Sequence, residues 1–330
     1  MFKHLYNELS LTLHIEPDGP ILIKAGETGA DPTRPDMEFV RTVYLGKETI
    51  YLPGSSLKGV LRAHCERLAR TVQVEKYSKE LGKFRLSCDP LEKALSCGDQ
   101  WNNEKRDAKE KKREAIKNEE IYKRSCFVCR LFGSTSLASR TRITDAYPKN
   151  PEAVKSEERN GVAIDRVFGS VAVGPFNYEV ATAGEFICHL QLRNFTIAQL
   201  GLLALALRDL EMQRVGIGFA KSRGLGRVNS SIHELTVRYP TCSLNGKLRL
   251  FGGTLPDTEP NQLPGVGRFP CSEDYGLDKE DLASLPGGIT LAADDWGEPF
   301  LRLDDAAKVK ELFRECVRSW KSTVEALQKS

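Results

Sequence analysis

Residues 185–193 read EFICHLQLR, and their apolar side chains occupy every second position: Phe186, Cys188, Leu190 and Leu192. This alternation predicts a half-buried β-strand. Apolar residues then recur at helical spacing between Ile197 and Leu210, which predicts a helix. A glycine-rich stretch, GIGFAKSRGLGR, occupies 216–227, and IHELTVRY at 232–239 again has the character of a strand. This part of the chain therefore predicts a strand, a helix, a glycine-rich loop and a strand.

The N-terminal part of the chain has a related order. Apolar residues alternate with polar ones between Leu9 and Ile15, which predicts another half-buried strand. After a long stretch rich in Gly, Pro and Asp, apolar residues follow helical spacing up to Arg70, with Ser55 or Ser56 placed to cap the helix. Two strand–helix passages predict an α+β fold, a split βαβ sheet of the ferredoxin-like kind with insertions.

Composition narrows the class of protein. The chain has 330 residues, 40% of them hydrophobic, and a formal net charge of +3. No apolar run reaches the roughly 18 residues that a membrane span needs, and the start, MFKHLYNELSLTL, turns polar too quickly for a signal peptide. We therefore expect a cytoplasmic protein with no membrane partner. The small net charge does not by itself indicate nucleic acid, so that argument depends on where the charges lie.

Composition also divides the chain. We expect a core over residues 1–240, interrupted by an insertion at about 71–129, and a C-terminal extension over 241–330. Within the insertion, 99–125 mixes many charges of both signs, which is typical of a solvated helix or a mobile excursion. The extension ends in LDDAAKVKELFRECVRSWKS (303–322), an amphipathic helix expected to pack on the core or on a neighbouring subunit.

The glycine-rich stretch does not match a nucleotide-binding loop. A dinucleotide fingerprint follows a strand and opens a helix, whereas this stretch follows a helix and precedes a strand. It also lacks the GK[ST] ending of a P-loop. Four basic residues and no acidic residue lie between positions 212 and 227: Arg214, Lys221, Arg223 and Arg227. Glycine amides beside such cations suit a phosphate chain, and the alternative is a tight connection with incidental surface cations.

A second basic and glycine-containing stretch, PGSSLKGVLR, lies at 53–62. The amides and serine hydroxyls of a helix N-terminus favour an anion, and Lys58 and Arg62 stand one turn apart on the same face. Two such sites on one sheet-based fold predict a track for single-stranded nucleic acid. The alternative is a capped amphipathic helix with ordinary surface cations.

Four cysteines form a candidate metal set: Cys88, Cys97, Cys126 and Cys129. The CFVC half has the spacing at which two thiolates share one tetrahedral ion, which predicts structural Zn²⁺. A thioredoxin-like redox pair is disfavoured because CFVC follows a charged insertion and no strand. Ordinary reduced cysteines are the alternative here and the expectation for the other five.

Several motifs in order resemble one family. PGSSLKGVLR is followed by CRLFGS (129–134), RTRITDA (140–146), GVAIDR (161–166) and GFAKSRGLGRV (218–228). Together they resemble the RAMP (repeat-associated mysterious protein) superfamily, and within it the backbone subunits of type III CRISPR effector complexes, with subtype III-D as the suggested branch. The resemblance runs from about residue 5 to 240 and implies an RRM/ferredoxin-like palm. The last 90 residues carry no recognised motif.

The resemblance implies RNA and protein partners. Such subunits stack along a guide RNA (crRNA), pair it with a target RNA, and assemble with neighbouring backbone, large and small subunits. A thumb hairpin, here at about 167–180, pushes one base out of the duplex. The implied guide contacts are Ser55, Ser56, Lys58, Arg62, Arg140, Arg166, Gly218, Lys221, Arg223, Gly224 and Gly226.

The resemblance also implies a site of cleavage and a zinc knuckle. Relatives that cut target RNA use an Asp between the first strand and the PGSS turn, which makes Asp36 the first candidate and Asp31 the second. The target's 2′-hydroxyl would attack the adjacent phosphate in line, helped by Mg²⁺. The alternatives are a non-catalytic structural subunit and a stand-alone ribonuclease that processes guide precursors. Some relatives take a zinc ligand from the helix after PGSS, so His64 is an alternative fourth ligand.

Overall fold

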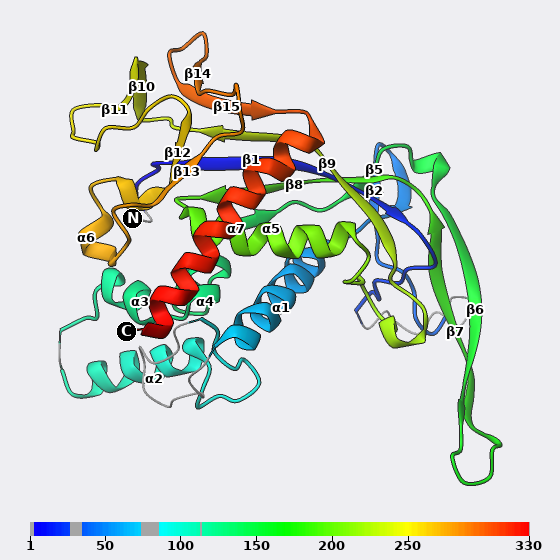
Figure 1. Cartoon of the computed structure of the whole chain (residues 1–330). Helices are drawn as coiled ribbons and strands as arrows, with labels where there is room; N and C mark the ends of the chain where they lie inside the picture. The colour runs from blue at the N-terminus through cyan, green and yellow to red at the C-terminus, as the bar shows by residue number, and fades with distance from the viewer. Residues whose placement is uncertain (1–2, 27–34, 74–85, 113, 330) are drawn as a thin grey trace.

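A computed structural model describes residues 3–26, 35–73, 86–112 and 114–329. Its centre is an antiparallel sheet in the order β9 (Val228–Arg238), β1 (Glu8–Pro17), β8 (Phe186–Arg193) and β4 (Thr141–Ile143). Two helices, α1 (Gly54–Val72) and α5 (Ile197–Glu211), cover one face of it (Figure 1). Along the chain the order is strand, helix, strand, strand, helix, strand. The fold is therefore α+β, and this split βαβ arrangement is consistent with a ferredoxin-like palm.

The alternating sequence pattern explains which face of the sheet is covered. Leu11 of β1 pairs with Leu190 of β8 and Leu235 of β9, and all three side chains are buried beneath the helices. The next residue, Thr12, pairs with His189, which is exposed on the opposite face. Because successive side chains of a strand point to opposite faces, one alternating run supplies both the core and a polar surface.

The C-terminal extension is continuous with the palm. Strand β15 (Pro299–Leu303) pairs with β9, so the central sheet continues beyond the core motifs. The last helix, α7 (Ala306–Lys329), lies against α5 (Figure 1). The two helices approach so closely that a Cβ at Gly201 of α5 would lie 2.1 Å from the Cys316 carbonyl oxygen of α7. Of the two expected places for this helix, the structure shows the one on the core.

The charged insertion is anchored by apolar residues. Its described helices are α2 (Cys97–Glu110) and α3 (Asn118–Arg124), followed by α4 (Phe127–Phe132). Trp101 of α2 and Tyr122 of α3 are fully buried, and Phe127 packs on Trp320 of α7. Beyond Trp101, α2 has no buried residue, as expected of a solvated helix, but the buried side chains of Trp101 and Tyr122 fix the insertion to the rest of the fold, which the dense charge pattern concealed.

A long hairpin leaves the sheet. Strands β6 (Lys155–Ile164) and β7 (Val171–Ala183) pair antiparallel and project from the palm (Figure 1). Val167 and Phe168 in its turn are more than 80% exposed, at 82% and 83%. The hairpin thus begins before the 167–180 segment that the sequence indicates.

The remaining elements are short. They are β2 (Arg41–Tyr44), β3 (Lys47–Ile50), β5 (Tyr147–Pro148), η1 (Pro151–Ala153), η2 (Lys221–Arg223), β10 (Cys242–Asn245), β11 (Lys247–Leu250), β12 (Gln262–Pro264), η3 (Val266–Arg268), α6 (Ser272–Tyr275), β13 (Leu282–Ser284) and β14 (Ala292–Ala293). Among the described residues, every helix is too short or too polar to cross a membrane.

Candidate metal centre and nucleic-acid interface

Four buried cysteines meet where the insertion rejoins the palm. Cys97 opens α2, Cys126 and Cys129 open α4, and Cys88 lies in the segment between α1 and α2. Their sulfurs all lie within 4.8 Å of one another, and the Sγ atoms of Cys88 and Cys129 are 3.7 Å apart. Tetrahedral coordination with Zn–S bonds of about 2.3 Å separates sulfurs by about 3.8 Å. The four thiols therefore fit Zn²⁺.

The surroundings of the cluster suit ionised sulfurs that share a cation. The backbone N–H of Cys129 donates to Cys126 Sγ, and that of Cys126 donates to Cys97 Sγ, each at 3.4 Å. Hydrogen bonds from Cys126 and the other two thiols lower the pKa of Cys88, whereas burial raises the pKa of Cys126. Thiolates buried together require positive charge nearby, which a bound divalent metal would supply.

His64 does not join the cysteines. Its Nε2 lies 2.8 Å from Asp209 Oδ2 on α5, so its ring faces the interface between α1 and α5. The prediction of His64 as an alternative ligand is corrected accordingly, because the four sulfurs already form the cluster without it. The same Asp209 accepts from Arg214 at 3.2 Å, which ties α1 and α5 to the start of the glycine-rich loop.

Arg140, which the family resemblance implies as a guide-RNA contact, does not lie on the surface. Its side chain is buried, and its guanidinium donates to Gln199 Oε1 at 3.1 Å and to the Asn194 carbonyl. It lies over the ring of Tyr122, 4.4 Å from the centroid, and burial lowers its pKa. Arg140 is therefore a core cation that links β-strand ends to the insertion, and it cannot contact RNA without unfolding this region.

The N-terminus of α1 is capped from a distance. The helix begins at Gly54, whose N–H donates to Asp145 Oδ1 at 2.8 Å, so the expected Ser55 or Ser56 cap is wrong. A Cβ at position 54 would lie 2.3 Å from the Ile143 carbonyl oxygen, which explains the glycine. Both serines lie in the first turn, Ser55 exposed and Ser56 half-buried.

The two basic residues of α1 have partners within the chain. Lys58 Nζ donates to Ser139 Oγ at 2.8 Å, and burial, followed by the nearby charges of Arg62 and Arg142, lowers its pKa. Arg62 donates to Glu66 and approaches Cys129 Sγ at 3.6 Å. Sequence reasoning missed Arg142, which is exposed beside Lys58; only its position in the RTR triplet pointed to it.

The glycine-rich loop lies on the segment that follows β1. Phe219 N donates to the Leu22 carbonyl at 2.7 Å, and Gly226 N donates to the Pro20 carbonyl at 2.9 Å. Gly218 has φ +75°, and a Cβ there would lie 2.2 Å from the Leu22 oxygen, so this close approach requires glycine. Gly224 also has positive φ, but in open space.

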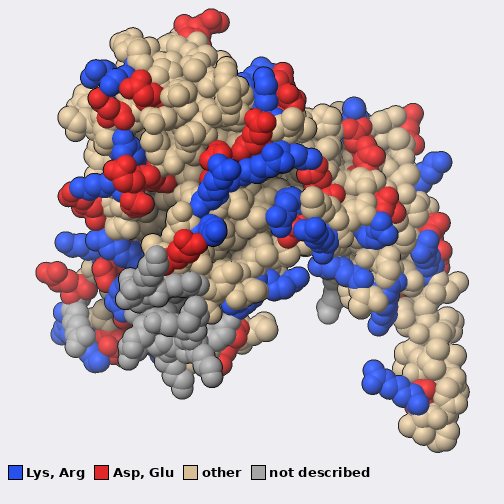
Figure 2. Space-filling view, viewed as in Figure 1, with Lys and Arg blue, Asp and Glu red and all other residues tan. Residues whose placement is uncertain are grey.

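The cations of this loop face outward. Lys221 and Arg223 are exposed, and neither forms an ion pair with another described residue. Partial burial, followed by the charge of Arg67 on α1, lowers the pKa of Lys221. Figure 2 shows Lys and Arg side chains gathered between the helical layer and the base of the hairpin. Arg67 is a cation that the sequence-based prediction did not include.

Asp36 lies beside the middle of β7. It is exposed, and its Oδ2 accepts from Asn177 N of β7 at 3.0 Å. The flanking backbone is paired with β7 as well, since Met37 N donates to the Asn177 carbonyl and Glu179 N donates to the Met37 carbonyl. Asp31 lies outside the described residues.

Residues 21–23 form backbone hydrogen bonds with the hairpin, the glycine-rich loop and the Asp36 segment. Ile21 forms a β-bridge with Ala181 of β7, while Leu22 accepts from the glycine-rich loop. Ile23 then accepts from Val40 in the Asp36 segment at 3.0 Å. The structure therefore brings the glycine-rich loop and Asp36 to one region, whereas Arg166 lies exposed in the far turn of the hairpin.

The fold places the chain among α+β proteins built on a split βαβ sheet. A family model described as the RAMP superfamily matches residues 14–229. This match covers more than half of the chain, and the protein belongs to the RAMP superfamily. Membership implies a role in binding CRISPR RNA together with other proteins of these complexes, in a superfamily that includes ribonucleases. No curated protein matches the chain.

Proposed function

We propose that this protein is a guide-RNA-binding backbone subunit of a type III CRISPR effector complex, of the III-D branch, that also cuts target RNA. The observation that carries the proposal is the backbone pairing of residues 20–23 with the glycine-rich loop, the Asp36 segment and β7. A guide held on the loop would thereby lie near both the Asp36 carboxylate and strand β7 of the hairpin.

The loop supplies the grip on the guide. Gly224 is exposed and Gly218 is half-buried, so phosphates can approach the backbone there, and Lys221 and Arg223 contribute charge. Gly226 is buried, and its N–H donates to the Pro20 carbonyl, so its predicted guide contact is corrected to a role in shaping the loop. The hydroxyls of Ser55 and Ser56, which do not cap α1, remain for phosphate or 2′-hydroxyl groups. Phosphate contacts position the guide, and base pairing selects the target.

A direct test replaces the loop cations. In Lys221→Ala/Arg223→Ala, affinity for guide RNA should fall at least tenfold, and the slope of log affinity against log salt should decrease by about 1.4, because two phosphate contacts to a single strand are lost. Lys308→Ala/Arg314→Ala, which removes two exposed cations from α7, is the charge-matched control. Equal affinities for the two double variants would contradict the loop as the guide site.

Cleavage would use the geometry where Asp36 meets the middle of β7. The hairpin (β6–β7) displaces one target base, and the freed nucleotide places its 2′-oxygen in line with the adjacent phosphorus. A new 2′-O–P bond forms as the 5′-oxygen leaves, which yields a 2′,3′-cyclic phosphate and a 5′-hydroxyl. Asp36 would orient the 2′-hydroxyl or hold Mg²⁺, which stabilises charge on the phosphate.

The test of cleavage uses the assembled complex with labelled target RNA and Mg²⁺. Asp36→Asn keeps a side-chain oxygen for the Asn177 amide but removes the charge, so products should disappear while target binding persists. Asp304→Asn, at an exposed site before α7, is the control and should cut normally. Normal cutting by Asp36→Asn would leave this protein as a structural RNA-binding subunit.

One observation favours a second function, a ribonuclease that processes guide precursors alone. His14 and His233 stack with their ring centroids 3.6 Å apart, and His14 Nδ1 lies 2.5 Å from Glu185. Such a pair can act as general acid and base on a bound phosphate. Cleavage of precursor RNA by the isolated protein in EDTA, abolished in His14→Ala, would establish it.

A further inference from the structure

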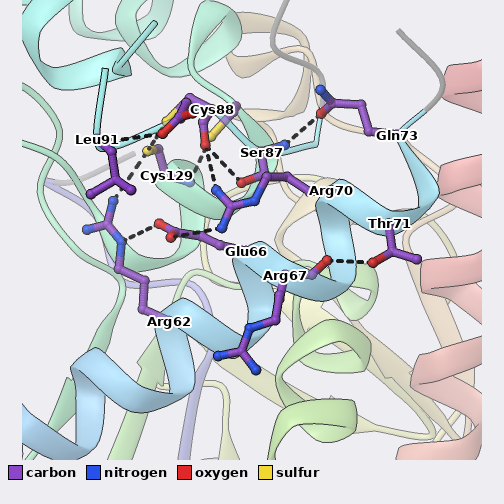
Figure 3. A network of polar contacts seen from close by, with 12 residues as sticks. Arg62, Glu66, Arg67, Arg70, Thr71, Gln73, Ser87, Cys88, Leu91 and Cys129 are labelled. Atoms are coloured by element: carbon purple, nitrogen blue, oxygen red, sulfur yellow. Dashed lines mark hydrogen bonds and ion pairs between the residues drawn. The ribbon is translucent and has the colours of Figure 1, made fainter. Parts of the chain in front are cut away.

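Helix α1 reaches the cysteine cluster with three charged side chains one turn apart. Arg62, Glu66 and Arg70 stand at successive i, i+4 positions and therefore share one face of the helix. Figure 3 shows this row running alongside the segment that carries Cys88. The row meets the cluster at two points, one on a sulfur and one on the backbone.

The first point is a sulfur atom. Arg62 Nη2 lies 3.6 Å from Cys129 Sγ, within hydrogen-bond distance for sulfur, while its Nε donates to Glu66 Oε1 at 2.9 Å. The guanidinium is thus held between a carboxylate and a candidate metal ligand (Figure 3). Burial opposes the charge of Arg62, but the bond to Glu66 and the nearby Cys129 raise its pKa overall.

The second point is the backbone. Arg70 Nη1 donates to the Cys88 carbonyl at 3.1 Å, and its Nη2 lies 3.8 Å from Glu66 Oε2. The Glu66 side chain is only 7% exposed, so this carboxylate is buried between two guanidinium groups. A buried carboxylate is stable only when paired, which makes Glu66 the part that fixes both arginines.

Four thiolates around one Zn²⁺ carry a net charge of −2, and donors to the sulfurs reduce that charge on the ligands. We propose that Arg62 is a positioning residue of the metal centre, and not a guide-RNA contact. Its N–H group holds the Cys129 thiolate, Glu66 orients its guanidinium, and Arg70 holds the Cys88 backbone. This proposal rests on zinc binding by the four cysteines and is independent of RNA cleavage.

A consequence concerns the RNA-binding end of the same helix. Because α1 is tied to the cluster through Arg62 and Arg70, metal loading would fix the helix whose first turn carries Ser55 and Ser56. Metal loss would therefore loosen the helix that carries these two serines.

The test loads the purified full-length protein with Co²⁺ as a spectroscopic substitute for Zn²⁺. In Arg62→Ala, the sulfur-to-cobalt charge-transfer band should move to lower energy, because a thiolate without its N–H donor gives up electrons more readily. Zinc affinity, measured by competition with a chelator, should fall about 10–100-fold. Arg62→Lys should recover part of both changes. Arg67→Ala, which removes an exposed arginine from the same helix, should match wild type.

The outcomes separate the two proposals. If wild type binds both metals and Arg62→Ala keeps the same band and affinity, the role of Arg62 is overturned and the metal centre stands. If wild type binds neither metal, zinc binding itself is overturned. Should Arg62→Ala fail to fold, as judged by circular dichroism, Arg62→Gln retains an N–H donor without the charge. A wild-type band energy with weakened zinc binding in Arg62→Gln would support the proposal, and unchanged zinc affinity would overturn it.

Discussion

The two halves of the palm use their helices in opposite ways. Helix α1 of the first half buries one side and leaves residues such as Gly59 and Arg67 exposed, and its charged side chains reach the cysteine cluster. Helix α5 of the second half is enclosed by the sheet and α7, and within it only Arg208 and Glu211 are exposed. Helix α1 therefore contacts other parts of the protein through its charged side chains, whereas helix α5 forms part of the hydrophobic core.

The largest difference between the two helices is expected when a glycine in each is replaced by alanine. Gly201→Ala in α5 should cost about 3 kcal/mol of unfolding free energy, because the new Cβ meets the Cys316 carbonyl oxygen at 2.1 Å and α7 must shift. Denaturant unfolding of the full chain measures the change.

Gly59→Ala in α1 is the matched control for that experiment. Nothing lies within 4 Å of its Cβ, so alanine should stabilise the protein by about 0.5–1 kcal/mol through helix propensity. Changes of the same sign at the two positions would break the comparison.

A smaller effect is expected in the loop that follows α5. Gly218→Ala should cost about 2 kcal/mol, because its φ of +75° is strained for alanine and the Cβ meets the Leu22 oxygen. Guide-RNA affinity should fall about tenfold as the loop backbone moves away from the phosphates.

Gly224→Ala isolates the conformational part of that effect. Its φ is +84°, but no atom lies within 4 Å of the new Cβ, so the loop should keep its place on residues 20–23. The free energy of unfolding should therefore fall by about 1 kcal/mol, from backbone strain alone, as denaturant unfolding measures. Equal losses of stability in both variants would show that backbone strain, and not the contact with Leu22, sets the cost at Gly218.

The smallest effect concerns the cap of α5. Asp281 accepts from Ile197 N and Gly267 N, and its burial raises the carboxyl pKa to about 7 from 3.8. Because the folded pKa is the higher one, stability falls as pH rises from about 4 through 7. Between pH 6 and pH 7 this group should cost about 1 kcal/mol.

Asp281→Asn tests that pH dependence. The amide cannot ionise. The fall in unfolding free energy between pH 6 and pH 7 should therefore be about 1 kcal/mol smaller in the variant than in wild type. The variant is expected to be less stable at both values, because its NH₂ group replaces one of the two oxygens and so faces the backbone N–H of either Ile197 or Gly267. An unchanged pH slope would show that Asp281 is ionised throughout this range.

The two basic, glycine-containing stretches also differ in whether their cations are exposed or bonded within the protein. The glycine-rich loop leaves Lys221 and Arg223 exposed, while PGSSLKGVLR directs Lys58 to Ser139 and Arg62 to the cysteines. The two stretches look alike in composition, and the difference between them came from partners 67 and 81 residues away along the chain. Whether a basic residue beside glycine is exposed therefore depends on whether an acceptor of the protein itself lies within reach.

The sequence by itself determined the elements and the metal set. Alternation predicted β1, β8 and β9, helical spacing predicted α1, α5 and α7, and the CFVC spacing indicated the cysteines, because these patterns depend on neighbours along the chain. Only the tertiary structure decided that Arg140 is buried, that Asp145 caps α1, and that Arg62 meets Cys129. The partner of a charged side chain depends on what folding brings within about 4 Å, and no local pattern encodes that distance.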